Sequence, residues 1–340
     1  MDSLTQIVLG AACGEAVLGK KIGNKALLFG AIAGTIPDLD VFVGRLLYNN
    51  EIQAMAFHRG FMHSILFAVL GAFIFGWFTY RLYNSSKRKR TTTQKDWIYL
   101  FFWAIITHPI LDCFTPYGTQ LFAPFSNYRV AFNTISVVDP LYTLPFLICM
   151  IIVLFFKRTN TKRLKWTKVG IYISSAYMIF TIINKFYIDA VFKESFEKEG
   201  IAFKRFSAQP TILNNILWYA VAETDKNYHF TFFSLFDKKS ISEKIMTIEK
   251  HHDLIDMNNA NLKTLTWFSN NYFNLSAKEN IGTYKYVDLR YPMLNPDDAS
   301  TSVFNFTIFL ENEKWDILPF DGTTPNKEDF RKFMERLKGI

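Results

Sequence analysis

Three short polar clusters interrupt the apolar first half of the sequence, and all three carry side chains that bind divalent metals. They are "IPDLD" (36–40), "HRGFMH" (58–63) and "THPILD" (107–112). Neutral imidazoles and carboxylates together favour zinc, manganese or iron. The candidate ligands are Asp38, Asp40, His58, His63, His108 and Asp112.

The spacing of the histidines indicates how they could face one ion. His108 and Asp112 are four residues apart, so on a helix they project from one face. His58 and His63 are five apart across a loop-to-helix junction, where Gly60 would let the backbone turn.

Asp38 and Asp40 follow Pro37, which ends a helical segment. In an extended stretch both carboxylates would point the same way. The six groups together exceed one tetrahedral site, so we expect one or two ions, most naturally a two-metal centre with a bridging carboxylate.

Such a centre activates water and stabilises both oxygens of a displacement, typically at a phosphoester. Arg59 could hold a phosphate or support a carboxylate ligand, and Asp139 is a second supporting candidate. We expect Asp38, His63 and Arg59 to take part in catalysis directly.

A simpler interpretation is that these groups are solvated or hydrogen-bonded, as single polar residues near a membrane usually are. Six ionisable residues in three clusters argue against it, because such residues are rare in apolar segments and tend to be functional. His229, His251 and His252 lack metal-ligand spacing, and we expect them at the surface or in packing.

The composition divides the chain into two parts. Half of the 340 residues are hydrophobic, yet the mean hydropathy is only +0.08. Residues 1–189 carry 19 Lys and Arg against 9 Asp and Glu, and residues 190–340 carry 19 against 21. The basic charge thus belongs to the apolar part, so we expect a membrane-embedded domain over 1–189 and no nucleic-acid partner.

Long apolar runs predict membrane helices, which need about 20 apolar residues. The runs are 61–83, 139–156 and 167–188, with a fourth over 97–115 that contains His108, Pro109 and Asp112. Segments 4–19 and 24–36 are rich in Gly and Ala, and could be short spans, a hairpin or re-entrant helices. We therefore predict a multi-pass α-helical membrane bundle of five or six helices.

Basic loops predict the orientation of this bundle. Loops 81–95 and 157–168 carry Lys and Arg without acidic residues, so both should be cytoplasmic. All three polar clusters, Asp139, and the Asp2–Gln6 end of the first helix then share the outer face.

The N-terminus and the cysteines are also informative about the compartment. The first segment has no basic residues before its apolar stretch, so we expect it to be retained. Cys13, Cys113 and Cys149 form no CxxC pair, so the sequence indicates neither a disulfide framework nor a zinc ribbon.

Four stretches carry a family resemblance. Together, "MDSLTQIVLGAACGEAVLGKK", "GAIAGTIPDLD", "HRGFMHS" and "THPILDCFTPYGTQLFAPFS" resemble the membrane-bound, LexA-regulated metal-dependent hydrolase family over the first 140 or so residues. "QPTILNNILWY" (209–219) is similar to the family's longer members. The resemblance implies a multi-pass inner-membrane protein, and it carries the family's ligands onto the six Asp and His residues named above.

A distant resemblance and two departures qualify this expectation. The Asp/His pattern is similar to that of zinc-dependent phospholipase C and the S1/P1 nucleases, which favours phosphoesters. Family members often have His where this chain has Gln6, so one metal would be bound more weakly or differently here. Met62 replaces a small polar residue, which we expect to alter packing only.

Residues 190–340 predict a soluble α+β domain on the extracytoplasmic side. Strand-like runs occupy 216–222, 228–236, 283–290 and 303–310, and helical patterns occupy part of 241–272 and most of 326–339. This domain could act as a lid or substrate selector, or could only stabilise the protein or recruit a partner.

These features predict an inner-membrane, metal-dependent hydrolase acting at the outer membrane surface on a lipid or lipid-linked phosphoester, with zinc, manganese or iron as the metal. One alternative is a metal or proton transporter, although runs 64–80 and 141–156 contain no charged residue. The other is a non-catalytic membrane scaffold with a structural metal, which a closed coordination site would favour.

Overall fold

The computed structural model describes residues 1–340 except 86–87, 240, 243, 279, 281, 294–301, 303, 312–313 and 319–326. Contacts divide the chain into two compact units. The first comprises Met1–Val43 and Phe57–Ile182, and the second Gly44–Ala56 and Ile183–Ile340. Residues 44–56 thus belong to the second unit although they lie within the sequence of the first. The sequence did not predict this assignment.

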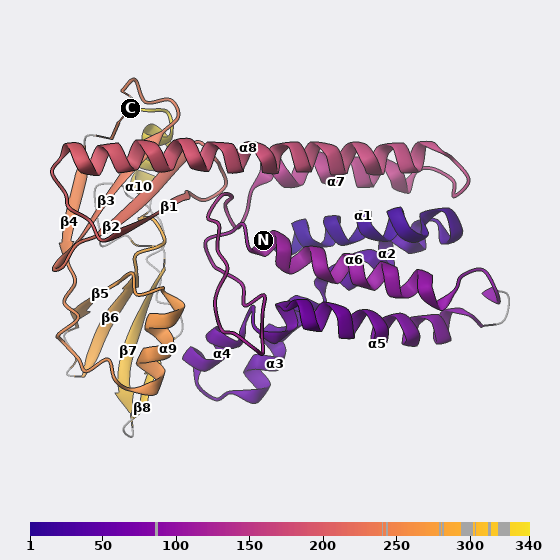
Figure 1. The fold of residues 1–340 in the computed structure, drawn as a ribbon, viewed down its shortest axis with the longest axis horizontal. Helices are drawn as coiled ribbons and strands as arrows, with labels where there is room; N and C mark the ends of the chain where they lie inside the picture. The colour runs from indigo at the N-terminus through magenta and orange to yellow at the C-terminus, as the bar shows by residue number, and fades with distance from the viewer. Residues whose placement is uncertain are drawn as a thin grey trace. The chain divides into compact units, whose positions relative to one another are not determined.

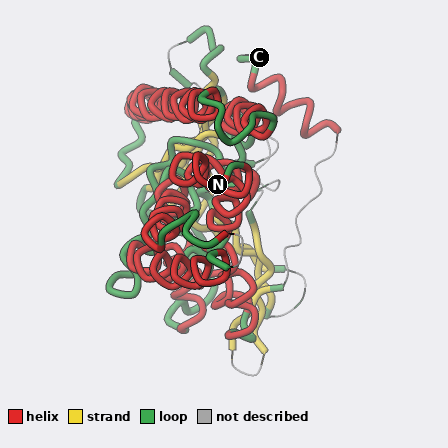
Figure 2. The backbone as a smooth tube through the Cα atoms, turned by 90° about the vertical axis from the view of Figure 1, so that its right-hand side faces the viewer, coloured by secondary structure: helices red, strands yellow, loops and turns green. Residues whose placement is uncertain are grey.

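The first unit is built from helices (Figure 1). Figure 2 views several of them nearly end-on. Helix α1 packs against α2, α6 and α7, and α5 packs against α6. The helices are α1 (Ser3–Ile22), α2 (Asn24–Thr35), α5 (Ile65–Tyr83), α6 (Gln94–Asp112), α7 (Pro140–Leu154) and the first part of α8 (Lys162–Lys198).

Glycines bring the backbones of α1 and α2 into direct contact. A Cβ atom at Gly10 would collide with the Gly30 carbonyl oxygen, and one at Gly14 would collide with the Ala26 carbonyl oxygen. Gly34 makes a similar approach to Gln6. Small residues at four-residue spacing are the usual means of close helix packing in membranes. These contacts hold Gln6 on α1 close to the end of α2, and both helices pack against α6.

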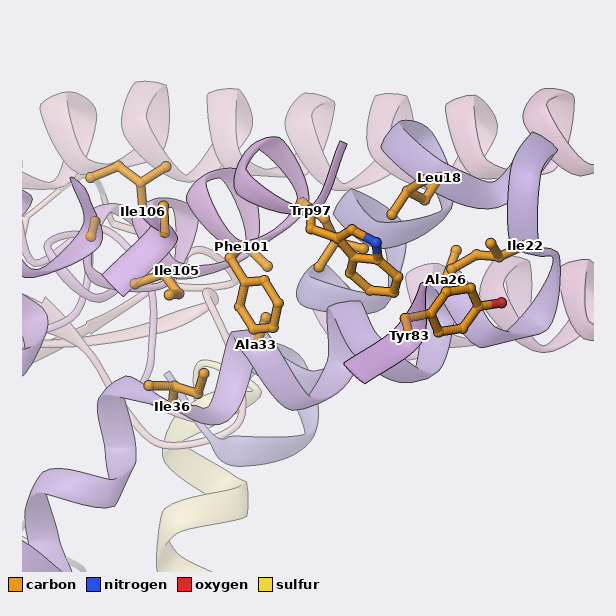
Figure 3. Close-up of a cluster of buried hydrophobic side chains, with 14 residues drawn as sticks. Leu18, Ile22, Ala26, Ala33, Ile36, Tyr83, Trp97, Phe101, Ile105 and Ile106 are labelled. Carbon is orange, nitrogen blue, oxygen red and sulfur yellow. The ribbon is translucent and has the colours of Figure 1, made fainter. Parts of the chain in front are cut away.

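Aromatic packing stabilises the end of the first unit where α6 begins, away from Gln6. Trp97 at the start of α6 is fully buried, and its Nε1–H donates to Thr92 Oγ1 at 2.9 Å. The Trp97 ring is tilted against the Tyr83 ring, with centroids 5.0 Å apart (Figure 3). It also lies edge-on to the Phe29 ring, with centroids 4.9 Å apart. Aromatic pairs of this geometry add to the stabilisation from buried area.

A buried ion pair joins four helical segments near this end. Arg163 Nε and Nη2 donate to the two Glu15 carboxylate oxygens at 2.8 and 2.6 Å. Its Nη1 donates to Asn24 Oδ1 and to the carbonyl oxygens of Val153 and Phe156. The side chains of Arg163 and Glu15 are each 3% exposed. The charges of this cluster therefore balance internally.

Two helices, α5 and α8, are long and apolar enough to cross a membrane. A third span results if α2 and the segment Pro37–Leu47, bent by 43° relative to it, are counted together, and α7 is apolar but shorter. The helical character of the first part of the chain is thus confirmed, with two or three candidate spans among the described residues. The total of five or six stays a prediction.

The second unit contains two antiparallel four-stranded sheets with strand orders β1-β2-β3-β4 and β5-β6-β7-β8. The strands of the first are β1 (Arg205–Pro210), β2 (Leu217–Glu223), β3 (Asn227–Ser234) and β4 (Ile245–Glu249). Those of the second are β5 (Phe273–Ala277), β6 (Thr283–Asp288), β7 (Asn305–Glu311) and β8 (Lys314–Ile317). Helices α9 (Ala260–Phe268) and α10 (Lys327–Leu337) complete the described elements.

These elements confirm much of the predicted α+β character. The four predicted strands correspond to β2, β3, β6 and β7, and the predicted final helix to α10. The region 241–272 contains both β4 and α9, so it is helical only in part, as expected. The cysteines Cys13, Cys113 and Cys149 are free.

Candidate metal centre

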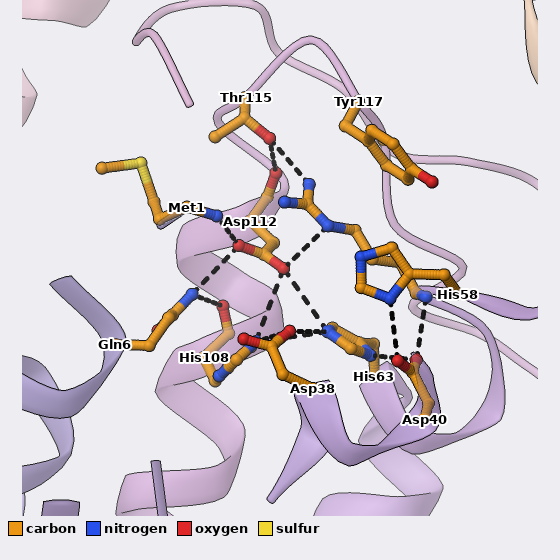
Figure 4. Close-up of polar contacts among 12 residues, drawn as sticks. Met1, Gln6, Asp38, Asp40, His58, His63, His108, Asp112, Thr115 and Tyr117 are labelled. Atoms are coloured by element: carbon orange, nitrogen blue, oxygen red, sulfur yellow. Dashed lines mark hydrogen bonds and ion pairs between the residues drawn. The ribbon is translucent and has the colours of Figure 1, made fainter. Parts of the chain in front are cut away.

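The two aspartates after α2 lie on a tight turn. Pro37–Leu39 forms the 3₁₀ turn η1, and Asp40 is the first residue of helix α3 (Asp40–Leu47). The expectation of an extended stretch is therefore wrong. Because residues two apart on such a turn point in different directions, Asp38 lies against the Nε2 atoms of His63 and His108, whereas Asp40 lies against His58 and the Nδ1 side of His63 (Figure 4).

His63 reaches the centre through a second turn. Helix α4 (Glu51–Phe57) precedes it, and Phe61–His63 forms the 3₁₀ turn η2. The left-handed residue between them is Arg59, with φ of 59°, and not Gly60. Gly60 is needed for a close approach, since a Cβ atom there would lie 2.7 Å from the Phe57 carbonyl oxygen. A non-glycine residue held in this backbone region is typical of functional sites.

Two imidazoles and two carboxylates converge at the end of α6. His63 Nε2 and His108 Nε2 are 3.2 Å apart, and each lies 3.3 Å from Asp38 Oδ1. Asp112 Oδ2 lies 3.5 Å from His63 Nε2 and 3.6 Å from His108 Nε2 (Figure 4). His108 and Asp112 therefore share one helix face, as their spacing predicts. We call these four residues the acceptor cluster.

The surroundings of the two imidazoles indicate where their protons lie. His108 Nδ1 is 2.6 Å from the Gly34 carbonyl oxygen, which can only accept, so Nδ1 carries the proton. His63 Nδ1 lies 3.0 Å from Asp40 Oδ2 outside hydrogen-bond geometry, and the charge of this carboxylate favours a proton on Nδ1. In the neutral rings both Nε2 atoms then present lone pairs to each other and to two carboxylate oxygens. This arrangement is repulsive unless a cation or additional protons occupy its middle.

The separations within the acceptor cluster are close to those between the ligands of one metal ion, and Asp38, His63 and His108 form the group close enough together to bind one. Ligand atoms about 2.0–2.1 Å from a zinc ion are roughly 3.3 Å from one another in a tetrahedron. The five separations given above run from 3.2 to 3.6 Å. Asp112 Oδ2 is also buried without a hydrogen bond among the described residues. The side chains present therefore fit a divalent metal ion.

Asp40 and His58 lie one layer outside this cluster. His58 Nδ1 is 2.7 Å from Asp40 Oδ1, and the Arg59 backbone N–H donates to Asp40 Oδ2 at 2.9 Å. Burial lowers the pKa of His58, against the opposing effect of its hydrogen bond to Asp40. Asp40 is thus placed to orient His63, an arrangement that commonly fixes a metal-binding imidazole. Among the described residues, one group of three possible ligands is close enough for one ion: Asp38, His63 and His108.

Arg59 supports a carboxylate, which is one of the two roles that the sequence left open. Its Nε lies 3.2 Å from Asp112 Oδ2, and its Nη1 donates to Thr115 Oγ1 at 2.9 Å. The guanidinium also lies over the Tyr117 ring, 4.6 Å from its centroid. Since Arg59 is buried, these contacts hold Asp112 in place.

Asp139 occupies a different position. It is the N-cap of α7, where its side chain accepts hydrogen bonds from the Leu141 and Tyr142 backbone N–H groups. The Tyr177 hydroxyl donates to its second oxygen at 2.9 Å. The structure therefore gives Asp139 a capping role in the helix bundle.

Two further contacts hold Asp112 from the side of α1. Gln6 Nε2 donates to Asp112 Oδ1 at 3.0 Å, and the Met1 amino group contacts the same oxygen (Figure 4). Sequence reasoning singled out Gln6 but missed Met1, because a main-chain amine carries no residue-type signal.

Comparisons with known proteins agree with the membrane assignment. "Uncharacterized protein YfhP" of Bacillus subtilis (strain 168) is 33% identical over 150 residues, which cover 41% of this chain and 42% of that protein. The alignment thus spans less than half of the relative. No solved structure matches the chain. The profile of the YdjM inner membrane protein family matches residues 1–188, which contain every residue of the acceptor cluster. The chain therefore belongs to the YdjM inner membrane protein family.

Proposed function

We propose that this protein is a metal-dependent hydrolase that acts at the outer surface of the inner membrane on a lipid or lipid-linked phosphoester. The observation that carries the proposal is the acceptor cluster, where Asp38 Oδ1, His63 Nε2 and His108 Nε2 lie close enough together to bind one ion and Asp112 Oδ2 lies 3.5 and 3.6 Å from the two imidazoles. A divalent cation there supplies Lewis acidity and lowers the pKa of water.

The residues around the cluster have distinct tasks in this proposal. Asp38, His63, His108 and Asp112 hold the metal ion. Asp40 orients His63, and Arg59 keeps Asp112 ionised and fixed. His58 acts through Asp40. The distant resemblance to zinc phospholipase C supports the phosphoester as the bond attacked.

Exposure favours a reactive site over a purely structural one. The Asp38 side chain is 26% exposed, whereas the His63, His108 and Asp112 side chains are at most 1% exposed. A structural site is normally closed by protein ligands on all sides, and a catalytic one keeps an open position. A substrate would approach beside Asp38.

The position of the cluster along the helices supports an outward-facing site. Helix α1 carries Gln6 near its start and Lys20 and Lys21 in its last turn, and α6 carries Lys95 near its start and ends at Asp112. An ion pair of 2.6 Å between Lys21 and Asp96 joins the basic ends. Basic loops remain cytoplasmic, so the cluster and the second unit are proposed to face outward.

The transporter alternative needs polar groups along the membrane depth. The buried acid further along α1 is Glu15, and both of its oxygens are bound by Arg163. It is therefore not available to carry an ion onward from the acceptor cluster. The scaffold alternative differs in predicting bound metal without turnover.

An assay in lipid nanodiscs tests the proposed function. Purified protein with added zinc or manganese is given phosphatidic acid or para-nitrophenyl phosphate, and phosphate release is measured. We expect turnover of the lipid alone, at least about 100-fold lower in Asp38→Asn and unchanged in His229→Ala, a substitution in the second unit. Equal turnover of both compounds would contradict a lipid substrate. Bound metal without any turnover would favour the scaffold.

A further inference from the structure

The segment between α6 and α7 exposes large aromatic side chains. Phe122, Phe125, Tyr128 and Phe132 are 49%, 84%, 65% and 51% exposed. They fall within residues 121–132, which we call the aromatic loop. Exposed aromatic residues this close together are unusual on a surface that faces water, and they mark an interaction site.

The aromatic loop is held firmly against the helical unit. At its base, Thr119 and Val130 exchange backbone hydrogen bonds of 3.1 and 2.9 Å. The Phe132 N–H donates to the Cys113 carbonyl oxygen at 2.7 Å, just beyond the end of α6. Arg129 Nη2 donates to the Tyr117 and Gly118 carbonyl oxygens. The exposed rings are therefore presented by a fixed backbone.

The loop also continues the lipid-facing surface of the helices. The Ile65 N–H at the start of α5 donates to the Leu121 carbonyl oxygen at 3.0 Å. From Ile65 onward α5 exposes apolar side chains along its length, including Phe73 and Phe78. Since α5 is a candidate membrane span, the aromatic loop begins where its apolar surface ends.

The chemistry of the loop fits the boundary between lipid tails and head groups. Aromatic rings concentrate at this level of a membrane, where an apolar body and a polar edge are both accommodated. A protein partner could also cover these rings, but their continuity with the apolar surface of α5 favours lipid.

We propose that the aromatic loop lies in the head-group layer of the membrane, with Phe122, Phe125, Tyr128 and Phe132 in contact with lipid. The Gln120 N–H donates to the Arg59 carbonyl oxygen at 3.0 Å, and Arg59 contacts Asp112. The loop thereby fixes the depth of the acceptor cluster at the lipid head groups. This proposal concerns lipid contact alone and stands or falls independently of hydrolytic activity.

Spin labelling of the full chain in lipid vesicles tests the proposal. A nitroxide is attached at Phe125→Cys and Phe132→Cys, and at Asp225→Cys, an exposed turn of the second unit. Labelled wild type corrects for Cys13, Cys113 and Cys149. Collision rates are measured with oxygen, which partitions into lipid, and with a water-soluble nickel chelate.

We expect oxygen collisions to exceed nickel collisions at positions 125 and 132, with the reverse at 225. Nickel-dominated collisions at all three positions would overturn the proposal by placing the loop in water. Protection of 125 and 132 from both reagents would also overturn it, by showing that protein covers the loop. Retention of the wild-type elution volume on size-exclusion chromatography verifies that each variant is folded.

Discussion

Buried charges lie toward both ends of α1, and the two groups are built differently. Near its basic end, Glu15 is matched by Arg163, whose remaining donor also finds acceptors. Near its first turns, the acceptor cluster brings two carboxylates and two imidazole lone pairs together, and the cations nearby, Arg59 and the Met1 amino group, reach Asp112 from outside.

The difference separates a structural role from a binding role. A buried ion pair with all its hydrogen bonds made needs nothing further, and it holds helices in register. A set of converging acceptors remains unfavourable until a positive charge enters. The two clusters are alike in being buried and charged. They differ in that the donors of Arg163 match the acceptors around it, whereas acceptors converge in the middle of the acceptor cluster without a donor between them in the described part of the chain.

The largest effect is expected from breaking the balanced cluster. Arg163→Met leaves the Glu15 carboxylate buried without a partner, which should lower the free energy of unfolding by about 3–5 kcal/mol. Thermal unfolding in detergent measures this loss. The double variant Glu15→Gln/Arg163→Met, with no unpaired charge, should be closer to wild type. Loss of bound metal from folded Arg163→Met would contradict the separation of the two clusters.

A smaller effect is expected from Asp40, which orients His63 without touching the middle of the acceptor cluster. Asp40→Asn should weaken metal affinity about 10–100-fold, as removal of such an outer carboxylate typically does. Titration with a zinc-chelating dye measures the affinity. Asp139→Asn is the matched control, because this residue only caps α7. Equal weakening in both variants would remove the special role of Asp40.

The smallest effect is expected at Gln6, which contributes a hydrogen bond to Asp112. Gln6→Ala should weaken metal affinity roughly fivefold, in line with about 1 kcal/mol for one hydrogen bond. Gln6→His introduces the residue that the resemblance to the metal-dependent hydrolases suggests at this position. This variant should bind metal at least as tightly as wild type. The same dye titration compares them. A His variant no tighter than the Ala variant would exclude a ligand role at this position.

The existence of the helices in the first unit was predictable from their local apolar patterns, although α8 (Lys162–Lys198) extends beyond its predicted run of 167–188 at both ends. The four-residue spacing of His108 and Asp112 on α6 is enough to predict their shared face. The roles of Asp38 and Asp40 were not predictable in this way. They depend on the turn after Pro37, where a 3₁₀ backbone in place of an extended one directs the Asp38 carboxylate to the metal position and the Asp40 carboxylate to His58 and the outer side of His63.

The second unit shows the same limit for strands. Strands β2 and β3 are rich in aromatic and apolar residues, and their sequences indicate them directly. Strand β8 has four residues, and β1 ends in proline, so neither has a strong pattern of its own. Both form by pairing with neighbours. The membership of residues 44–56 in this unit likewise depends on contacts distant in sequence, such as Asn50 Nδ2 with the Trp315 carbonyl oxygen.

The central claim is that the acceptor cluster binds a divalent metal, and metal content per chain tests it most directly. Elemental analysis of detergent-purified protein should find about one zinc, manganese or iron ion per chain, as one tetrahedral site requires. His63→Ala and Asp112→Ala should lose the ion, and His229→Ala should keep it. No bound metal in the wild type, with folding unchanged in the variants, would contradict the metal centre and the hydrolase proposal with it.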